Sequence, residues 1–214
     1  MKYIDYYTFM SQWDQLAKKE TIDKAIEALK INGIDARFVG NKEEAKRLVL
    51  EFIPEGSEVM TMTSTTLETI GLSGEINREK SKFKPVRDKL YAMDRATETQ
   101  EMNRLGAAPE YVLGSVHAVT VDGHVLIASN TGSQLPAYAY AALHVIWVVG
   151  AQKIVKDTEE GLKRIYEHSL PLESERAKKA YGVPGSSVNK ILIINKEVQP
   201  GRITLILVNE VLGF

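Results

Sequence analysis

The chain has 214 residues, 44% of them hydrophobic and 26% charged, and its 27 basic and 28 acidic side chains leave a formal net charge of −1. This balance excludes binding of nucleic acid or an anionic membrane by bulk charge, but it allows a local anion site. The absence of cysteine excludes disulfides, thiolate nucleophiles and iron–sulfur ligation. No apolar run resembles a signal peptide or reaches the roughly 20 residues of a membrane span, so we expect a cytoplasmic protein.

The N-terminal segment is rich in aromatic side chains, namely Tyr3, Tyr6, Tyr7, Phe9 and Trp13. Aromatic residues bury large areas where they dock, which favours packing on the body of the protein; an arm that covers a partner subunit is the alternative. Apolar residues recur at helical spacing from Gln12 to Ile31, and Asn32-Gly33 is a typical helix stop. We predict a single domain over residues 1–214, with residues 1–33 as a helical segment packed on it.

Strand and helix patterns alternate after this segment. Residues 34–39 and 58–63 are short strand patterns, and Asn41 is a typical N-cap for the helix between them, which ends at Pro54. The alternation predicts an α/β fold with a largely parallel central sheet and helices on both faces.

Two polar regions follow the second strand. Ser64, Thr65 and Thr66 precede a helix that starts near Leu67, where hydroxyl and N–H groups either bind an anion or only cap the helix. Residues 75–106 are strongly polar and predict either a helical excursion over the sheet edge or a mobile lid.

Residues 116–128 carry the strongest hairpin signal in the chain, with two apolar runs joined by Asp122-Gly123. Because both faces of the pair are apolar, we expect the hairpin to be buried on both sides. Asp122 is interpreted as a turn former. His117 and His124 would lie more than about 10 Å apart on the ladder, too far to share one zinc ion, so no metal site is predicted.

The loop after the hairpin is the strongest candidate for a ligand-binding segment. It runs from Ser129 through Asn130, Thr131, Gly132 and Ser133 to Gln134. Open α/β sheets hold anionic ligands where the carboxyl end of a strand leads into a helix N-terminus, although a loop of this type also serves as a simple capped connection.

Charged residues near the ends of the later strands are the remaining candidates. Lys153 follows an apolar strand at 143–149 and is placed to pair with a phosphate or carboxylate. Residues 174–181 are predicted as a helix that ends at Gly182. Residues 191–194 and 203–208 are predicted as final strands, joined by a Pro200-Gly201 turn. Glu197 and Glu210 border these strands and are the candidate carboxylates for catalysis.

Several stretches of the chain resemble the LUD-domain family, named for lactate utilisation. They are STTLETIGL at 64–72, AVTVDG at 118–123 with Thr131-Gly132, VIWVVGAQKIVKDTEEGLKR at 145–164 and RITLILVNEVLGF at 202–214. The resemblance implies a three-layer α/β/α fold like that of the NagB/RpiA/CoA-transferase group. It also implies a pocket for a small anionic metabolite near residues 64–66, 131–134 and Lys153. Residues 181–189 replace a cysteine-rich insertion of many relatives, and no cofactor is predicted.

Three functional hypotheses follow. The first is a cytoplasmic accessory component in the utilisation of lactate or a related 2-hydroxy acid, which binds a small anionic metabolite. The second is a stand-alone transferase or isomerase acting on acyl-CoA or a sugar phosphate, with Glu197 or Glu210 as its nucleophile or base. The third is a non-enzymatic subunit that recruits partners through its aromatic N-terminus and residues 75–106. A homo-oligomer or partner subunits of a lactate-oxidation system are the expected assemblies, and whether the chain is an enzyme stays open.

Overall fold

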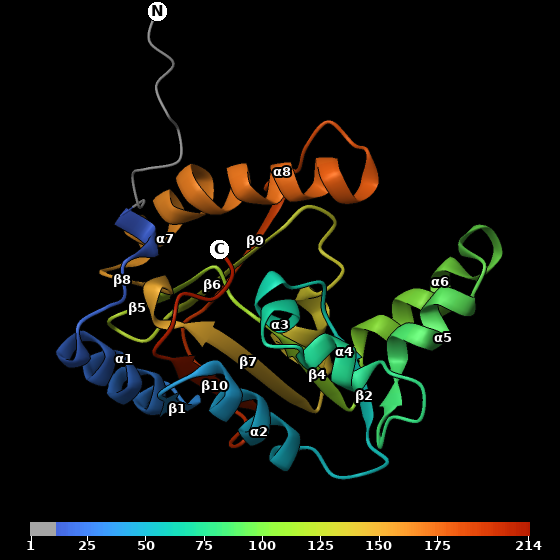
Figure 1. Ribbon diagram of the computed structural model, residues 1–214, viewed down its shortest axis with the longest axis horizontal. Coiled ribbons are helices and arrows are strands. Elements are labelled where there is room, and N and C mark those ends of the chain that lie inside the picture. Colours follow the sequence, from blue (N-terminus) through green and yellow to red (C-terminus); the bar gives the residue numbers. More distant parts are fainter. Residues whose placement is uncertain (1–11) are drawn as a thin grey trace, which may run out of the picture.

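A computed structural model describes residues 12–214, which form an α/β fold with a parallel central sheet (Figure 1). The predicted packing of the aromatic residues at 3–9 lies outside the described residues. The first described element is a 3-10 turn, η1 (Gln12–Asp14), followed by helix α1 (Lys19–Ile31). Asn32 ends α1, and Gly33 adopts a φ of +81°, so the predicted helix stop is confirmed.

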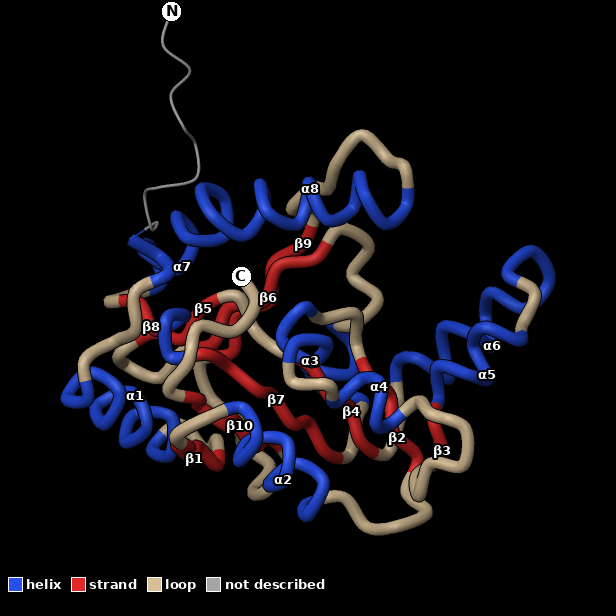
Figure 2. The backbone as a smooth tube through the Cα atoms, viewed as in Figure 1, coloured by secondary structure: helices blue, strands red, loops and turns tan. Residues whose placement is uncertain are grey.

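Six parallel strands build the central sheet in the order β1-β10-β7-β4-β2-β3 (Figure 2). They are β1 (Asp35–Val39), β10 (Ile203–Val208), β7 (His144–Gly150), β4 (Tyr111–Gly114), β2 (Glu58–Thr61) and β3 (Lys84–Pro85). The sheet confirms the predicted α/β class. Because the strands are parallel, all their carboxyl ends lie at one edge, where such sheets place their ligands.

Three helices cover one face of the central sheet. They are α2 (Lys42–Phe52), α3 (Thr65–Thr69) and α4 (Leu72–Ile76). Their apolar side chains form one cluster with residues of β7 and β10, including Ile146 and Ile206. The predicted cap of α2 is present, because the Asn41 side chain accepts a hydrogen bond from the backbone N–H of Glu44.

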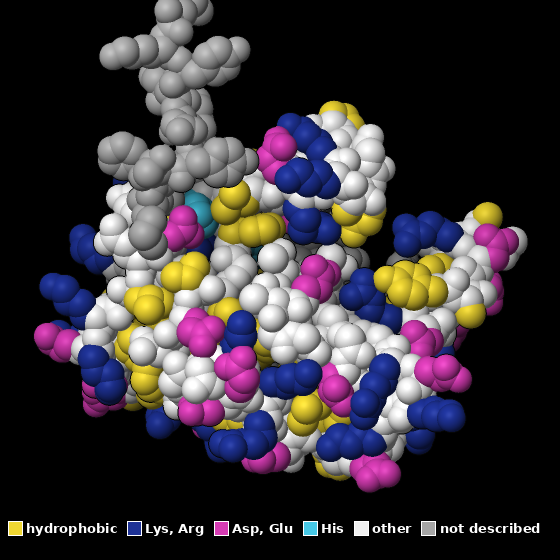
Figure 3. Space-filling view, in the orientation of Figure 1, with side chains coloured by type: hydrophobic (Ala, Val, Ile, Leu, Met, Phe, Trp, Pro, Cys, Tyr) yellow, Lys and Arg dark blue, Asp and Glu magenta, His cyan; other side chains and the backbone are white. Residues whose placement is uncertain are grey.

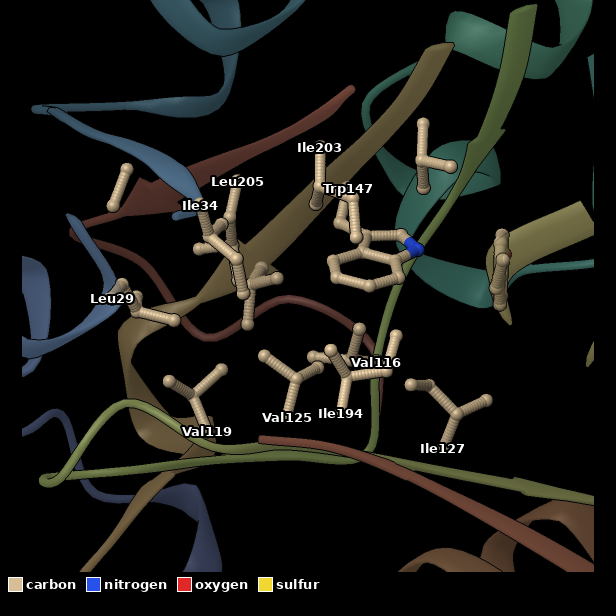
Figure 4. Packing of buried hydrophobic residues seen from close by; sticks show 14 of the residues in the cluster. Leu29, Ile34, Val116, Val119, Val125, Ile127, Trp147, Ile194, Ile203 and Leu205 are labelled. Atoms are coloured by element: carbon tan, nitrogen blue, oxygen red, sulfur yellow. The ribbon is translucent and has the colours of Figure 1, made fainter. Parts of the chain in front are cut away.

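The opposite face packs against α1 and a second, four-stranded sheet in the order β8-β5-β6-β9. Its strands are β8 (Ile154–Val155), β5 (Ala118–Thr120), β6 (Val125–Ser129) and β9 (Lys190–Ile194). Figure 4 shows the two sheets face to face, with Trp147 and Leu205 of the central sheet pointing toward Val125 and Ile194 of the smaller one. Their contact forms the largest apolar cluster among the described residues.

The predicted hairpin is formed by β5 and β6, which pair antiparallel through Ala118 and Leu126. Every residue of both strands is buried, so burial on both sides is confirmed. The inner face meets the central sheet, and the outer face is covered by α7 (Thr158–Arg164) and a π-helical turn, η4 (Ile165–Ser169).

The last two strands are formed as predicted, but they belong to different sheets. β9 pairs antiparallel with β6, whereas β10 lies between β1 and β7. The Pro200-Gly201 turn, with a Gly201 φ of +75°, therefore leads from one sheet to the other. An apolar run encodes extended structure, but the choice of its partner strand depends on the rest of the fold.

The polar region at 75–106 is a helical excursion at the sheet edge. After β3 the chain forms α5 (Val86–Ala92) and α6 (Arg95–Ala107), which project away from the body in Figure 1. None of the residues of α6 is buried. This hairpin of helices is one of the two alternatives that the composition predicted.

The remaining elements lie at the two edges of the central sheet. They are the π-helical turn η2 (Ala137–Ala141), which lies just before β7, and the 3-10 turn η3 (Ala151–Lys153) and helix α8 (Leu170–Tyr181), which come after it. The predicted helix end at Gly182 is confirmed by its φ of +67°, although α8 begins at Leu170 rather than Ser174. Of the helices within residues 12–214, none has the length and apolar character needed to cross a membrane.

Candidate functional site

A polar cavity of about 330 Å³ lies at the carboxyl edge of the central sheet. The segments after β2, β4 and β7 line it together with the loop after β6, the helix α8 and part of α5. Figure 3 shows the surface hollowed between α8 and the α5–α6 hairpin, with Lys and Arg side chains on its borders. Adjacent parallel strands that end at the same edge bring these distant segments together.

The cavity brings together most of the predicted ligand-binding residues. Those that line it are Ser64, Thr65, Thr66, Asn130, Thr131, Ser133, Gln134 and Lys153. Gly132 is not a lining residue, and its role is to turn the loop. It has a φ of +88°, and its N–H donates to Ser129 Oγ at 2.8 Å.

Two hydroxyl residues at 64–66 have different roles: Ser64 caps a helix, and Thr66 forms part of the cavity floor. Ser64 Oγ accepts a hydrogen bond from the N–H of Leu67 and caps α3, which is the capping alternative. Thr66 is buried, and its Oγ1 donates to the carbonyl of Leu212 at 3.2 Å. Thr66 therefore ties the start of α3 to the segment after β10, directly at the cavity floor.

The loop at 129–134 forms the rim of the cavity and is held by its own hydrogen bonds. Ser129 Oγ donates to Gln134 Oε1 at 2.9 Å, and the N–H of Ser133 donates to Thr131 Oγ1 at 3.3 Å. Asn130, Thr131 and Ser133 are exposed. The loop follows β6 of the smaller sheet, whereas we expected it to follow a strand of the central sheet. It lines the same cavity as residues 64–66 because the two sheets pack together.

Lys153 lies on the floor of the cavity and is only 2% exposed. Its Nζ is within hydrogen-bond distance of three oxygen atoms. They are Thr66 Oγ1 at 3.3 Å, Ser115 Oγ at 3.2 Å and Val116 O at 3.2 Å. Burial, reinforced by the nearby charge of Arg164, holds the pKa of Lys153 well below its ordinary value. The side chain is thus a buried amine between hydroxyl groups.

Two further basic residues lie behind the cavity floor. Arg164 is fully buried and donates from Nη1 to His117 O at 2.6 Å and to Ser169 Oγ at 3.2 Å. His117 lines the cavity, and its Nδ1 accepts a hydrogen bond from the N–H of Ala128 at 3.1 Å. Burial, with the charges of Lys153 and Arg164, lowers the pKa of His117 to about 3, so its ring is neutral at physiological pH.

Two arginines line the outer part of the cavity. Arg87 of α5 donates from Nη2 to Thr63 Oγ1 at 3.2 Å and to Tyr91 Oη at 2.8 Å, which are both neutral groups. Arg176 of α8 forms a two-point ion pair with Glu173, with both distances at 2.7 Å. Among the described lining residues, Arg87, Lys153 and Arg176 are the Lys or Arg side chains and Glu173 is the acidic one. The site therefore has the polarity that an anion requires.

The segment after β10 closes the cavity from one side. Gln152 Nε2 donates to the carbonyls of Leu212 and Gly213 at 3.1 and 3.2 Å, and Phe214 lines the cavity. A Cβ atom at Gly213, which has a φ of +61°, would lie 2.5 Å from Thr66 Oγ1. Glycine is needed here because the backbone approaches the cavity floor so closely.

The model of the LUD-domain family matches residues 22–208. The chain belongs to the LUD-domain family. This membership supports a role related to lactate utilisation at the level of the family. No curated protein matches the chain.

One solved structure supports the fold of this LUD domain. A crystal structure of a DUF162 family protein from Deinococcus radiodurans is similar with a TM-score of 0.57 and 12% sequence identity, covering 91% of this chain and 100% of that one. At this identity the similarity shows the fold alone. The structure of eIF2B beta from Chaetomium thermophilum gives a TM-score of 0.37 at 19% identity, covering 57% of this chain and 42% of that one, and no argument rests on it.

Several cavity residues of the LUD domain were not predicted from the sequence. Ser115 had a usable signal, because it directly follows the apolar strand β4. His117 was considered only as a metal ligand, and its actual role as a neutral acceptor depends on burial. Arg87 and Arg176 lie in polar helical segments where nothing local separates them from ordinary surface arginines.

Glu197 does not belong to this site, which corrects its selection as the candidate catalytic carboxylate. It does not line the cavity, and its Oε2 accepts a hydrogen bond from Arg202 Nε at 2.8 Å. Its Oε1 accepts from the N–H of Gln199. These contacts hold the turn before β10, at the amino edge of the central sheet, so the geometry gives Glu197 a structural role.

Proposed function

We propose that this LUD domain binds a small organic anion in the cavity and acts as an accessory component in the utilisation of lactate or a related 2-hydroxy acid. The single observation that carries the proposal is the composition of the cavity. Hydroxyl groups dominate its lining, Lys153 lies on its floor, and Arg87 and Arg176 stand at its outer part. Carboxylates and phosphates are bound by this combination of cationic and hydroxyl donors.

The cavity size and the charge of Arg87 narrow the ligand class. A volume of about 330 Å³ suits a small metabolite, at the lower end of the range for ligand sites. Arg87 bonds only neutral hydroxyl groups among the described residues, so its guanidinium retains an uncompensated charge toward the cavity. A 2-hydroxy or 2-oxo acid fits this arrangement. Its carboxylate would bind Arg87, and its 2-hydroxyl or 2-oxo group would bind the hydroxyl groups of Thr66 and Ser115 on the cavity floor.

Ligand-induced thermal stabilisation tests this proposal. We expect L-lactate, pyruvate or inorganic phosphate to raise the melting temperature of the full chain, because a ligand that binds only the native state stabilises it. Arg87→Gln should weaken the affinity about 10-fold to 100-fold, the usual value of hydrogen bonds to charged groups. Thr131→Ala should reduce the ligand shift while leaving the melting temperature of the unliganded protein nearly unchanged.

A matched control is available on the far edge of the sheet. Arg37 of β1 is exposed and pairs with Asp35, outside the cavity. Arg37→Gln should therefore leave the ligand shifts unchanged. The proposal fails if none of the three anions shifts the wild-type melting temperature, or if Arg37→Gln weakens binding as much as Arg87→Gln does.

The transferase or isomerase alternative depended on Glu197 or Glu210, and neither carboxylate lines the cavity. Glu197 lies in an ion pair outside the cavity, and no experiment on that carboxylate bears on turnover at this site. Any chemistry in the cavity has to use the groups that line it.

A further inference from the structure

We propose that Ser115 and Lys153 form a nucleophile–base pair, and that this LUD domain transfers acyl groups from esters or thioesters of small carboxylic acids. The inference rests on the proposed function for the place where the substrate lies, since the same cavity receives it. It adds a reaction, a nucleophile and a base to a site that so far only binds.

The arrangement around Lys153 has the three parts of an activated nucleophile. Ser115 Oγ is 3.2 Å from Lys153 Nζ, within reach of a proton transfer. Val116 O and Thr66 Oγ1, at 3.2 and 3.3 Å, hold the amine in place. A nucleophile, a base at hydrogen-bond distance and groups that orient the base are the features shared by serine-dependent acyl-transfer sites on unrelated folds.

A neutral amine at Lys153 is compatible with the contacts of this cluster, in which Thr66 Oγ1 also lies 3.3 Å from Ser115 Oγ. Its two N–H groups donate to Val116 O and to Thr66 Oγ1, and the Thr66 hydroxyl donates onward to Leu212 O. Nζ lies 3.2 Å from Ser115 Oγ, so the lone pair of a neutral amine is within reach of the Ser115 hydroxyl proton. Lysine acts as a base only through this lone pair.

The surroundings of Lys153 favour its neutral form. Among the described residues, no carboxylate forms an ion pair with it. The charged and titratable groups that interact with it are Arg164, His117 and His168. Burial and the positive charge of Arg164 lower the pKa of Lys153, which increases the fraction of free base near neutral pH.

The burial of Ser115 and Lys153 matches their roles as nucleophile and base. Ser115 is half-buried and lines the cavity, whereas Lys153 is almost completely enclosed between Thr66, Val116 and the backbone near Gly213. A substrate that enters the cavity therefore meets the serine hydroxyl, with the amine behind it. This order argues against Lys153 itself as the attacking group.

The reaction balances without a cofactor or an oxidant. Ser115 Oγ attacks the acyl carbon while its proton passes to Lys153 Nζ, and the bond to the leaving oxygen or sulfur breaks. The ammonium of Lys153 returns that proton to the leaving alcohol or thiol. A water or a second alcohol then attacks the acyl-serine, Lys153 again takes and returns the proton, and the acid or the new ester is released.

The lining of the cavity indicates the substrate class. The cavity has a volume of only about 330 Å³, and Thr66 and Ser115 place hydroxyl groups next to Lys153, which suits a short acyl chain. Arg87 and Arg176 stand toward the outside, where they suit an anionic leaving group. We therefore expect short-chain acyl thioesters or esters whose alcohol or thiol part carries phosphate or carboxylate.

Covalent labelling of the full chain tests the inference directly. The protein is incubated with acetyl-CoA or p-nitrophenyl acetate, quenched in acid and examined by intact-mass and peptide mass spectrometry. We expect one acetyl group on Ser115, absent in Ser115→Ala. Labelling should slow at least about 100-fold in Lys153→Met, the usual contribution of a general base.

Matched controls come from residues outside the cavity. Ser73→Ala and Lys156→Met alter a serine on α4 and an exposed lysine three positions after Lys153, and both should label at the wild-type rate. Lys153→Arg introduces a side chain that stays protonated and has no free lone pair near neutral pH, so it should be as slow as Lys153→Met. Melting temperatures of all variants establish that each one is folded.

The pH profile and the binding measurements separate the possible outcomes. The labelling rate should rise with pH through a midpoint well below the ordinary pKa of lysine, as Lys153 loses its proton. Absence of acetyl on Ser115, acetyl on Lys153 instead, or equal rates in wild type and Lys153→Met would each overturn the inference. The anion-induced thermal shift of the wild-type protein is measured separately, so a shift without acetylation would overturn acyl transfer alone, whereas the loss of the shift would overturn anion binding.

Discussion

Arg202 and Lys153 are both buried basic residues, and they lie at opposite edges of the same sheet. Arg202 precedes β10 at the amino edge and is 4% exposed, whereas Lys153 follows β7 at the carboxyl edge and is 2% exposed. Arg202 has a carboxylate partner in Glu197 and donates to the carbonyls of Ala137, Ala142 and Tyr138. Lys153 has hydroxyl groups, one carbonyl and an adjacent cavity.

The difference in hydrogen-bond partners distinguishes Arg202, a structural cation, from Lys153, which we propose to be functional. A buried charge with a carboxylate and several carbonyl acceptors is satisfied by the protein itself and gains nothing from a ligand. A buried amine without a carboxylate, beside a polar cavity, is either neutral and basic or charged by a bound anion. Burial alone therefore does not identify a site, and the partner of the buried group does.

The largest expected effect is on the structural side of the comparison. Glu197→Ala leaves Arg202 buried without its carboxylate, and we expect the free energy of unfolding to fall by about 3 to 5 kcal/mol. Urea unfolding followed by circular dichroism measures this change. The double variant Glu197→Ala/Arg202→Met should recover most of the loss, and a loss below about 1 kcal/mol in the single variant contradicts a structural ion pair.

A pH titration of stability is expected to reveal the lowered pKa of Lys153. Between its folded pKa and the ordinary lysine value of about 10.4, the unfolded chain binds a proton that the native protein does not. The free energy of unfolding should therefore rise with pH in that window, by up to about 1.4 kcal/mol per pH unit. Measurements between about pH 7 and 9.5 avoid the ordinary titration ranges of histidine and tyrosine.

Variants identify the origin of this rise. Lys153→Met should flatten the curve in that window, and Lys156→Met, which changes an exposed lysine, should retain it. An unchanged slope in Lys153→Met would mean that another group binds the proton on unfolding.

The smallest effect is expected for the stability of Lys153→Met at neutral pH. The substitution exchanges a buried amine for an apolar side chain of similar length, and removal of the desolvation cost offsets the lost hydrogen bonds. We expect the free energy of unfolding to change by about 1 kcal/mol or less. A loss as large as that of Glu197→Ala would place Lys153 with Arg202 among the structural cations.

Much of the fold could be predicted because its signals are local. The alternation of strands and helices, the cap at Asn41, the hairpin at Asp122-Gly123 and the helix end at Gly182 each depend on a few neighbouring residues. The second sheet could not be predicted, because the apolar pattern of β6 and β9 indicates extended structure but does not indicate which strands they pair with.

The lining of the cavity was predicted in part for the same reason. Residues 64–66, 130–134 and Lys153 follow strands, where hydroxyl and basic side chains are informative by their position in the chain. Arg87 and Arg176 belong to helices that reach the cavity only through tertiary packing. Glu197 was chosen because it borders a strand, but it lies at the edge of the central sheet opposite the cavity.

The sequence by itself determined the family, the parallel α/β core and the polar loops that line the cavity, because periodicity, turn residues and strand ends are properties of the local chain. Only the tertiary structure decided which of two buried basic residues, Arg202 or Lys153, has a carboxylate partner among the described residues. Arg202 and Lys153 both border apolar strands, and neither position in the sequence reveals its partner. The packing of two sheets placed a carboxylate beside one and a hydroxyl-lined cavity beside the other, and the chemistry of each follows from that partner.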